Sequence, residues 1–391
     1  MSKKVAGSVK RRPSMGGSAN RKVVAKGPGP VRYAVVGAGH IAQNAVLPAF
    51  AQAQNSKLVA VFSDDAAKRR RLTNDYGLEF AAGYDQFAKA CESGLFEAVY
   101  VALPNTMHRE YAIAAAKAGV HVLCEKPLAT TAADCRAMIA AAARADVRLM
   151  TAYRLHFERA NMTAVDWATS GKLGELRAFS SVFSMQVKEG NTRLQSKMGG
   201  GPLYDIGIYS INAARYLFRA NPIEVVALQA TGNDKRFKQI GEMVSAAMRF
   251  PGERLAAFTC SFGAADAGRY ELLGTKGSLT LDPAFEYEGE LKLTVKVGKV
   301  ARETTFPKRD QFAPEIEHFS ECVRLGRQPE PGGAEGMIDV AIIEAIQKSA
   351  RLGRAVKLGG LPNDSYPSLA QERRRAPARK PKMVGVQAPT R

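Results

Sequence analysis

The stretch that decides the fold is VRYAVVGAGHIAQNAVLPAF, which occupies residues 31–50. Its apolar start predicts a buried strand, its glycines a tight turn, and the remainder a helix. Gly37 permits the turn, and Gly39 lets the backbone approach a phosphate group closely. The helix that follows offers free N–H groups and a positive dipole end to such an anion, which we also expect His40 and Ile41 to contact. The pattern predicts the first unit of a dinucleotide-binding domain.

The end of the second predicted strand selects the cofactor. The run LVAVFS ends at Ser63, where a chain that binds NAD normally carries an acidic residue against the adenosine ribose. Here a hydroxyl stands at that position and is followed by DDAAKRRR, so several cations can surround a 2′-phosphate. Residues 68–71 can also form an exposed, solvated helix turn, and we select Lys68 and Arg69 as the phosphate-binding pair. NADP is the expected cofactor, although Asp64 keeps NAD open.

Two further predicted strands end in residues suited to a ligand site. They are AVYVALPNTMH, at residues 98–108, and VHVLCEKP, at residues 120–127. In an open α/β sheet the ligand lies beyond the carboxyl ends of the strands, so both loops converge on one cofactor with the glycine turn. The candidate cofactor-contacting residues of these loops are Leu103, Pro104, Asn105, His108, Glu125 and Lys126. His108 either flanks the nicotinamide pocket or has a structural role.

The pattern changes after a helix, TAADCRAMIAAAARAD, and a short strand, RLMTAYR, which complete a first domain at residues 31–152. Beyond it, segments such as RAFSSVFSMQV, MVSAAMRF, RLAAFTCSF and LKLTVKV alternate or run apolar without intervening helices. They predict a large, mostly antiparallel sheet with helices along one side. The expected fold class is α/β: an N-terminal Rossmann domain with a parallel sheet, then a C-terminal α+β domain at residues 153–360 for substrate binding and oligomerisation.

The positive charge is concentrated at the two ends of the chain. The 391 residues carry a formal net charge of +19, of which residues 1–32 contribute +9 and residues 363–391 contribute +5. Both ends are poor in large apolar side chains, so we expect a basic disordered arm at residues 1–30 and a basic disordered tail at residues 361–391. The body between them is not strongly basic, so we expect nucleic-acid contact only nonspecifically, through the ends.

The sequence also indicates the compartment. It contains no apolar run of membrane-spanning length, and its first residues lack the apolar segment of an export signal. The five cysteines are scattered, without a CxxC pair or a partnering histidine cluster, which is typical of reduced thiols and indicates no metal site. We expect a cytoplasmic protein that binds no metal and has no membrane partner.

Four longer motifs occur in order across both predicted domains: CEKPLA, AYRLHFE, GGGPLYDIGIYSINAARYLF and QFAPEIEHFSECVRLGRQPEPGGAEGMIDVAIIEAI. Together they resemble the Gfo/Idh/MocA oxidoreductase family, most of all its glucose–fructose oxidoreductase branch, over about residues 31–356. The resemblance implies a nicotinamide cofactor, a cyclic sugar or polyol in the interdomain cleft, and hydride transfer at one carbon. It also implies that Lys126 is catalytic, that Asp205 is a substrate-binding carboxylate, and that Tyr209 stands where many relatives carry histidine. Arg154 resembles the family's arginine below the nicotinamide.

Lys126 is the candidate acid–base group of this site. Hydride can leave an alcohol carbon only as the hydroxyl proton departs, so an acid–base group must hydrogen-bond that oxygen. We expect burial at the strand end to lower the pKa of Lys126 toward the range of a general base. Asp205 and Tyr209 lie four residues apart on one helix face, and Lys126 is the expected cation that lowers the pKa of the phenol. The alternatives are a surface ion pair for Glu125 and Lys126, and a core position for Tyr209.

These features favour a cytoplasmic NADP-dependent oxidoreductase that oxidises an aldose or reduces a ketosugar. The alternative within enzymes is a transhydrogenase of glucose–fructose type that retains its cofactor. The alternative of another class is a catalytically silent NADP-sensing regulator with nucleic-acid-binding arms, against which Lys126, Asp205 and Tyr209 argue. The segment NTRLQSKMGGG lacks the tryptophan of the glucose–fructose branch, so the sugar specificity of that branch does not transfer. We expect a homodimer or homotetramer formed through the C-terminal sheet.

Overall fold

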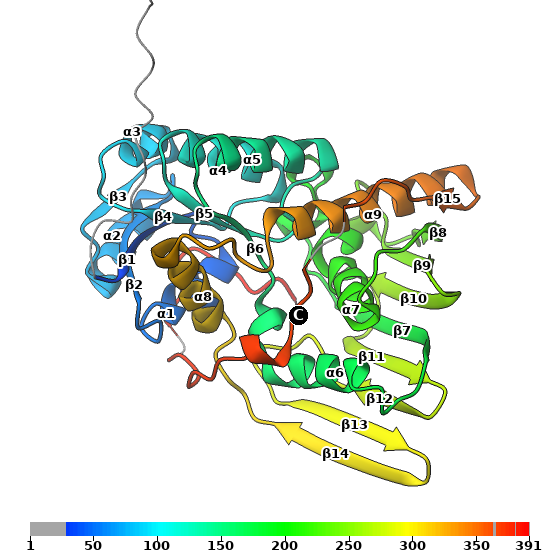
Figure 1. Ribbon diagram of the computed structural model, residues 1–391. Coiled ribbons are helices and arrows are strands. Elements are labelled where there is room, and N and C mark those ends of the chain that lie inside the picture. The colour runs from blue at the N-terminus through cyan, green and yellow to red at the C-terminus, as the bar shows by residue number, and fades with distance from the viewer. Residues whose placement is uncertain (1–28, 363–364, 380, 391) are drawn as a thin grey trace, which may run out of the picture.

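Two β-sheets organise the chain (Figure 1). The computed structural model describes residues 29–362, 365–379 and 381–390. The first 28 residues, in which the sequence predicts a basic arm, lie outside the described residues. One sheet has six strands and the other has nine. No helix among the described residues is both long and apolar enough to span a membrane.

The first sheet is entirely parallel, with the strand order β3-β2-β1-β4-β5-β6. Its strands are β1 (Val31–Val36), β2 (Ser56–Phe62), β3 (Phe80–Ala82), β4 (Ala98–Val101), β5 (His121–Glu125) and β6 (Leu149–Ala152). Because helices cover both faces, the central strands β1 and β4 are apolar and almost wholly buried. The order changes direction between β1 and β4, and ligands of such sheets bind beyond the strand ends at this point.

Short helical segments connect these strands. They are η1 (Ala42–Val46), α1 (Leu47–Ala49), α2 (Ala66–Tyr76), η2 (Tyr84–Gln86), α3 (Phe87–Cys91), η3 (Asn105–Met107), α4 (His108–Lys117), α5 (Ala132–Arg144) and η4 (Arg154–Phe157). The Asp65 side chain caps α2 by accepting hydrogen bonds from the N–H groups of Ala67 and Lys68. Gly77, with φ of 60°, ends the same helix in the left-handed conformation that glycine tolerates.

The second sheet has the order β14-β13-β12-β11-β7-β10-β9-β8-β15. Only the central pair β7–β10 is parallel, and all other neighbours are antiparallel. The strands are β7 (Leu176–Ser184), β8 (Glu224–Ala230), β9 (Met243–Phe250), β10 (Arg254–Ser261), β11 (Ala267–Gly274), β12 (Gly277–Leu281), β13 (Leu291–Val297), β14 (Val300–Phe306) and β15 (Val356–Lys357). The two sheets confirm the expected α/β class.

Helices cover one face of the second sheet. The helical segments of this half are α6 (Arg159–Thr169), η5 (Thr192–Leu194), η6 (Ser196–Met198), η7 (Leu203–Gly207), α7 (Ile208–Phe218), η8 (Lys235–Phe237), α8 (Phe312–Leu325), α9 (Gly333–Leu352) and η9 (Leu369–Gln371). Of these, α6, η7, α7 and α9 contact the sheet. Strand β9 alternates between exposed and buried residues along its whole length, as expected when one face of a sheet is buried against helices.

Helix α8 follows the second sheet in the chain but packs on the first. It contacts β1, β2 and β5, and its Phe312, Ile316 and Phe319 share a core with Tyr33 of β1. The Tyr33 hydroxyl lies 2.7 Å from the Ser320 hydroxyl. From the sequence this helix was assigned to the second domain. The apolar stripe of a helix indicates that it packs on a sheet but not on which one.

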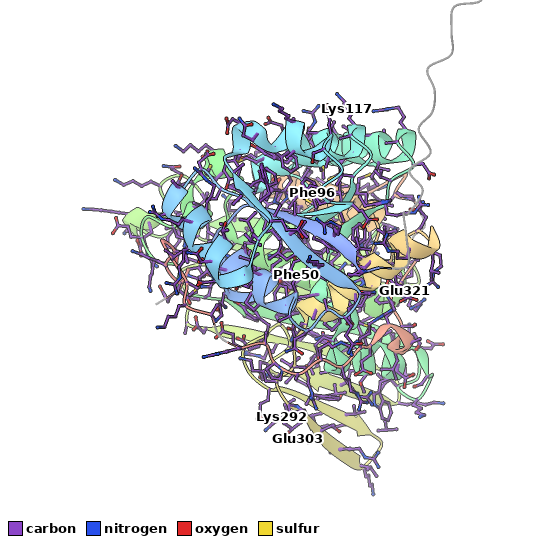
Figure 2. All side chains as sticks on the ribbon, turned by 90° about the vertical axis from the view of Figure 1, so that its left-hand side faces the viewer. Phe50, Phe96, Lys117, Lys292, Glu303 and Glu321 are labelled. Atoms are coloured by element: carbon purple, nitrogen blue, oxygen red, sulfur yellow. The ribbon has the colours of Figure 1, made fainter. Side chains whose placement is uncertain are left out.

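Figure 2 contrasts the packed body with an exposed hairpin. Phe50 and Phe96 lie among the Rossmann layers and are 9% and 2% exposed. The hairpin of β13 and β14 projects from the body, and Lys292 and Glu303 form an ion pair of 3.4 Å across it. Such an exposed pair contributes little stability because water screens it.

The tail at residues 365–379 and 381–390 differs from the expected disorder. Figure 1 shows this red segment returning toward the middle of the molecule. Arg375 pairs with Glu317 of α8 at 2.8 Å, and the backbone of Val384 hydrogen-bonds to the side chain of Gln43. Residues 363–364, 380 and 391 lie outside the described residues. Composition did not reveal this path because ion pairs and backbone bonds attach the tail, together with the isolated apolar residues Tyr366 and Leu369.

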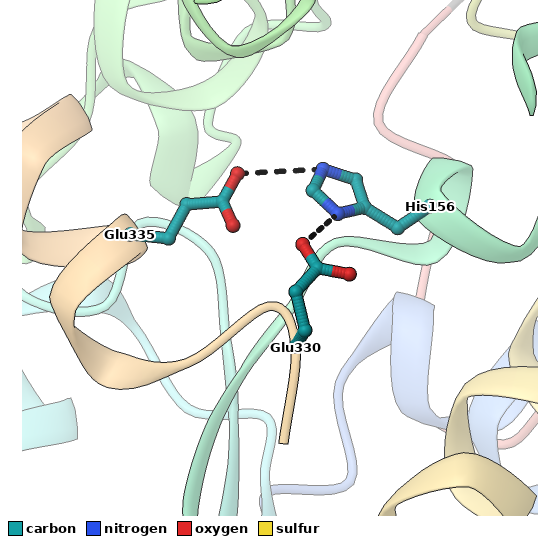
Figure 3. Close-up of side chains that lie close together, drawn as sticks. All are labelled: His156, Glu330 and Glu335. Carbon is teal, nitrogen blue, oxygen red and sulfur yellow. Dashed lines mark hydrogen bonds and ion pairs between the residues drawn. The ribbon is translucent and has the colours of Figure 1, made fainter. Parts of the chain in front are cut away.

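A buried polar network joins the end of β6 to α7 and α9 (Figure 3). The His156 ring nitrogens lie 3.0 Å from Glu330 and 3.5 Å from Glu335, and the second nitrogen is also 2.8 Å from the Asn212 carbonyl oxygen. Burial of His156 works to lower its pKa, but the two carboxylates outweigh this and raise it to about 9. His156 is therefore an imidazolium at neutral pH, with both N–H groups bonded.

The carboxylates of this network also have a second cation. Arg215 donates to Asp339 at 2.6 Å, and Tyr153 donates to the other oxygen of Asp339 at 2.5 Å. The ligand atoms of His156, Glu330 and Glu335 lie within 4.8 Å of one another, which a metal ion could use. An imidazolium that donates a hydrogen bond from each ring nitrogen has no lone pair with which to bind a metal. We interpret the cluster as an ion-pair network that fixes the segment after β6 to α7 and α9.

The raised pKa of His156 predicts a pH-dependent stability. The folded value of about 9 exceeds the ordinary histidine value, so His156 stabilises the fold fully below pH about 6.5, and this contribution is lost as pH rises to 9. A shift of this size corresponds to about 3 kcal/mol. We expect the free energy of unfolding, measured by urea titration, to fall across this interval.

The matched pair of variants is His156→Gln and His318→Gln. The first should reduce the decline between pH 6.5 and 9, because the raised pKa of Glu315 leaves a second contribution in place. The second should keep it, because burial lowers the pKa of His318 to about 4 and leaves that ring neutral throughout the interval. A His156→Gln protein with the decline of the parent would contradict the assignment.

Candidate active site

A cavity of about 1200 Å³ lies between the two sheets. Its walls come from the turn after β1, the loops after β4, β5 and β6, segment η7, and the second sheet. It brings together most residues that the sequence assigned to the site: Gly39, His40, Ile41, Leu103, Pro104, Asn105, Glu125, Lys126, Arg154, Asp205 and Tyr209. The cavity lies at the switch point between β1 and β4, where the parallel sheet predicts a ligand.

The glycine turn after β1 forms one wall. Gly37 has φ of 99°, and a Cβ at this position would lie 2.4 Å from the Ala102 carbonyl oxygen, so any side chain would push the turn away from the end of β4. A Cβ at Gly39 would meet nothing within 4 Å. The backbone of Gly39 is therefore open on this side, and its contact with a phosphate stays a prediction.

Lys126 reaches across the cavity from the end of β5 to η7. Its Nζ donates to the Asp205 carbonyl oxygen at 2.7 Å and to Asp205 Oδ1 at 3.3 Å. Burial works to lower the pKa of Lys126, but Tyr209, Asp205 and Glu125 act in the other direction and hold it above its ordinary value. The expectation that burial would lower this pKa is wrong, because three neighbouring groups stabilise the ammonium.

Arg193 is a member of the site that sequence reasoning missed. Its Nε donates to Asp205 Oδ2 at 2.6 Å, opposite the oxygen that faces Lys126. Burial raises the pKa of Asp205, but Arg193 and Lys126 together hold it near 2, so this carboxylate stays ionised. The only signal was its place upstream of Gly199-Gly200-Gly201, a place that gives an arginine no specific role.

Tyr209 contacts two cations of the cavity, Lys126 and Arg154, in different ways. Its hydroxyl accepts a hydrogen bond from Arg154 Nη2 at 3.3 Å, whereas Lys126 Nζ lies 4.8 Å from the centre of its ring. Arg154 also donates to the Phe285 carbonyl oxygen at 2.7 Å and to the Gln311 side chain. The expected proximity of Lys126 and Tyr209 is present, but Lys126 faces the ring and Arg154 faces the hydroxyl.

Behind the loop after β5, one tyrosine hydroxyl lies between two carboxyl groups. The Tyr100 hydroxyl is 2.9 Å from Glu125 Oε1 and 3.4 Å from Glu315 Oε2. Burial raises the pKa of both carboxyls, that of Glu315 strongly. Glu315 Oε1 has no hydrogen-bond partner among the described residues. The single hydroxyl proton of Tyr100 can be donated to only one of the two carboxyl groups at a time.

His108 has a structural place. Its side chain is fully buried, and its two nitrogens lie 2.9 Å from the carbonyl oxygens of Pro127 and Leu103. Burial lowers its pKa. Because a neutral ring carries one N–H, it donates to one of these oxygens and packs against the other, between the loop after β4 and the loop that carries Lys126. The cavity wall does not include it.

The residues predicted to select the cofactor lie at the end of β2, outside the cavity wall. Arg69 donates to the Ser63 carbonyl oxygen at 2.5 Å, and Lys68 lies beside Gly385 of the tail. Lys68 and Arg69 are half-buried, whereas the next two arginines are exposed. Asp64 Oδ1 accepts the Tyr84 N–H at 2.9 Å, so this acid faces the loop after β3.

Comparisons with known proteins agree with this architecture. Residues 31–153 match the oxidoreductase family with an NAD-binding Rossmann fold, and residues 161–280 match the GFO/IDH/MocA C-terminal domain. A dTDP-3,4-didehydro-2,6-dideoxy-alpha-D-glucose 3-reductase of Saccharopolyspora spinosa is 32% identical over 83% of this chain and 98% of its own length. A D-xylose 1-dehydrogenase [NADP(+)] of Haloarcula marismortui is 28% identical over 84% of this chain and 93% of its own.

Solved structures of other proteins are also similar to this chain in three dimensions. An aldose-aldose oxidoreductase of Caulobacter crescentus, complexed with glycerol, has a TM-score of 0.81 and 36% identity, and the match covers 84% of this chain and 100% of that one. A 3-ketoreductase of Actinomadura kijaniata in complex with NADP and TDP-benzene has a TM-score of 0.75 and 28% identity, covering 82% and 98%. From its two matched domains and these relatives, the chain belongs to the GFO/IDH/MocA oxidoreductase family.

Proposed function

We propose that the protein transfers hydride between NADP and a sugar or sugar-derived alcohol or carbonyl. The observation that carries this proposal is the Lys126 ammonium, held 2.7 Å from the backbone oxygen of Asp205 inside the interdomain cavity. Relatives with the same two domains include reductases and dehydrogenases of sugars, and some are described with NADP. When bound, the nicotinamide would supply or accept the hydride.

The residues present fit such a cofactor. The open backbone at Gly39 suits a phosphate, and the half-buried Lys68 and Arg69 suit a 2′-phosphate beyond β2. Asp64, the acid that could favour an unphosphorylated ribose, is bonded to the Tyr84 N–H. These features favour NADP over NAD.

The charges around Lys126 favour its role as a proton donor. Because its pKa is held above the ordinary value, Lys126 is charged at neutral pH and can donate to the oxygen of a carbonyl that is being reduced. In the oxidising direction the same group must first lose its proton. The rate of reduction should therefore be flat through neutral pH, whereas the rate of oxidation should rise with pH.

The surroundings of the site favour an enzyme over a silent regulator. Arg373 and Arg375 of the basic tail are paired with Glu321 and Glu317 of α8, so part of the charge that could attract a nucleic acid is used within the chain.

The five cysteines are free and buried, which supports a reducing, cytoplasmic location.

One prediction concerns the choice between NADP and NAD. The double change Lys68→Ala/Arg69→Ala should lower the preference for NADP over NAD at least tenfold, because a charge-assisted phosphate contact contributes about 1.5–3 kcal/mol. Dissociation constants for both cofactors, measured by fluorescence titration, give the ratio. The matched control is Arg70→Ala/Arg71→Ala, which removes two neighbouring exposed cations and should leave the ratio unchanged. Equal ratios in both double variants would reject the assignment.

Another prediction concerns the role of Lys126 in catalysis. Lys126→Ala should lower turnover about 100-fold or more, with NADP binding largely kept, because the proton donor is lost. It should also abolish the rise of oxidation with pH. Steady-state rates on whichever aldose or ketosugar a substrate screen identifies provide the measurement.

Two further variants sharpen this test. Tyr209→Phe keeps the ring beside Lys126 but removes the hydroxyl that Arg154 contacts, so it should lower turnover and change the pH profile. Lys117→Ala changes an exposed lysine at the end of α4 and should match the parent. Parent-like turnover in the Lys126→Ala protein would exclude the proposed site.

The open face of the second sheet favours a homo-oligomer. On two strands that flank β9, Leu228 of β8 is 74% exposed and Leu255 of β10 is 53% exposed, and Val226 of β8 is 46% exposed. Apolar residues gathered on one sheet face commonly mark an interface between protein chains. Such a face fits a second copy of this chain.

The oligomer can be tested by one change on this face. Leu228→Glu should lower the mass measured by size-exclusion chromatography with light scattering, because it buries a charge in the interface. The control, Val300→Glu, changes a residue that is 70% exposed on the projecting hairpin and should keep the parent mass. A monomeric parent protein would overturn the proposal.

A further inference from the structure

The C-terminal tail crosses the cavity that the cofactor is proposed to occupy. Among the residues that form the cavity wall, seven belong to the tail: Met383, Gly385, Val386, Gln387, Ala388, Pro389 and Thr390. They face residues of the glycine turn and of the site around Lys126. The tail therefore spans from the Rossmann sheet to the second sheet on one side of the cavity.

The tail is fixed to the Rossmann side by a side-chain amide. Gln43, only 1% exposed, donates from Nε2 to the Val384 carbonyl oxygen at 2.9 Å and accepts the Val384 N–H at 2.8 Å. The same Nε2 also contacts the Ala38 carbonyl oxygen at 2.9 Å, within the glycine turn. One buried amide thus links the tail directly to the turn that suits a phosphate.

The next tail residue covers the end of β2. Gly385 has φ of 59°, and a Cβ there would lie 2.9 Å from Lys68 Cε and 3.3 Å from Asp65 Oδ2. The tail backbone thus runs against the lysine that is proposed to contact the 2′-phosphate. A side chain at this position would be strained both by the left-handed backbone and by these neighbours.

The far side of the tail is fixed to the second sheet. The Lys188 N–H donates to the Pro389 carbonyl oxygen at 2.9 Å, and Thr390 forms an antiparallel bridge with Val187. Upstream, Arg375 pairs with Glu317 at 2.8 Å. The tail is thus attached at both sides of the cavity and on α8.

The volume left beside the tail shows whether the tail fills the cavity, as a plug, or only covers it. With the tail in place the cavity still measures about 1200 Å³, and Gly39 and Lys126 remain in its wall. Small-molecule and cofactor sites commonly measure about 300–1,000 Å³. The tail therefore forms a wall and leaves the room that a dinucleotide and a sugar need.

We propose that residues 383–390 are a strap that closes over the bound dinucleotide, so that the cofactor leaves only when the strap lifts. The inference rests on the proposed use of NADP and not on the identity of the sugar. A strap of this kind slows cofactor release and favours the transhydrogenase alternative. In that reaction one sugar alcohol loses a hydride and a proton, and a second sugar carbonyl gains both before the cofactor dissociates.

The test measures release of NADPH from the full chain and from two altered chains. One ends after Lys382 and lacks the strap, and the other carries Gly385→Val, which displaces it through strain at one residue. NADPH fluorescence, followed after rapid mixing with excess NADP, gives the dissociation rate. We expect a rate at least tenfold higher in both altered chains, and loss of NADPH from them during gel filtration.

The control is Gly359→Val, where a Cβ would meet nothing within 4 Å and the backbone is not left-handed. It should release NADPH at the parent rate. Equal release by the parent and the shortened chain would reject the strap and leave NADP use intact. Tighter binding by the shortened chain would show a plug instead, and would also reject the strap. Absence of NADPH binding in every chain would reject the cofactor and the strap together.

Discussion

The carboxylate of Asp205 is the constraint on which the site depends. It lies between Lys126, which follows the first sheet, and Arg193, which precedes η7 in the second half of the chain. A buried charge is costly unless it is paired, and removing one partner leaves the others uncompensated. Asp205 therefore fixes two cations at once and holds the lysine of one domain against the helical turn of the other. The same pairing keeps the proton on Lys126.

Charge also fixes the segment after β6 to α7 and α9, away from the cavity and by a different arrangement. His156 and Arg215 supply the cations, and Glu335 and Asp339 of α9 are among their partners. Together with the packing of α8 on β1 and β2, this network means that the second half of the chain returns to cover the first. The cavity is consequently bounded by segments that are held on both sides rather than by two independent units.

The fold could be predicted from sequence because its signals are local. The glycine turn, the apolar runs and the polar strand ends each occupy a few adjacent residues, and they located Lys126 and the loops after β4 and β5. Contacts between distant segments left no such signal. Arg193 is one of 56 basic residues, and Glu315 lies 215 residues from Tyr100. The direction of the Lys126 pKa was wrong for the same reason, because neighbours from other segments set it.

The net charge of the tail did not predict which residues the tail contacts. Composition placed +5 at residues 363–391, which is typical of a solvated end, yet two of those arginines pair with glutamates of α8. The Arg373–Glu321 pair is partly exposed and contributes little, whereas Glu317 of the Arg375 pair is buried; the backbone bonds at Val384 and Pro389 add to this attachment. Such weak, distributed attachment suits a segment that must both close and lift.

Closure of the cavity has a consequence for proton transfer. A covered site excludes water, and charges interact more strongly there than in solution. In the proposed transhydrogenase reaction, the proton taken from one sugar would stay inside until a second sugar accepts it, and Lys126 is the group placed to hold it.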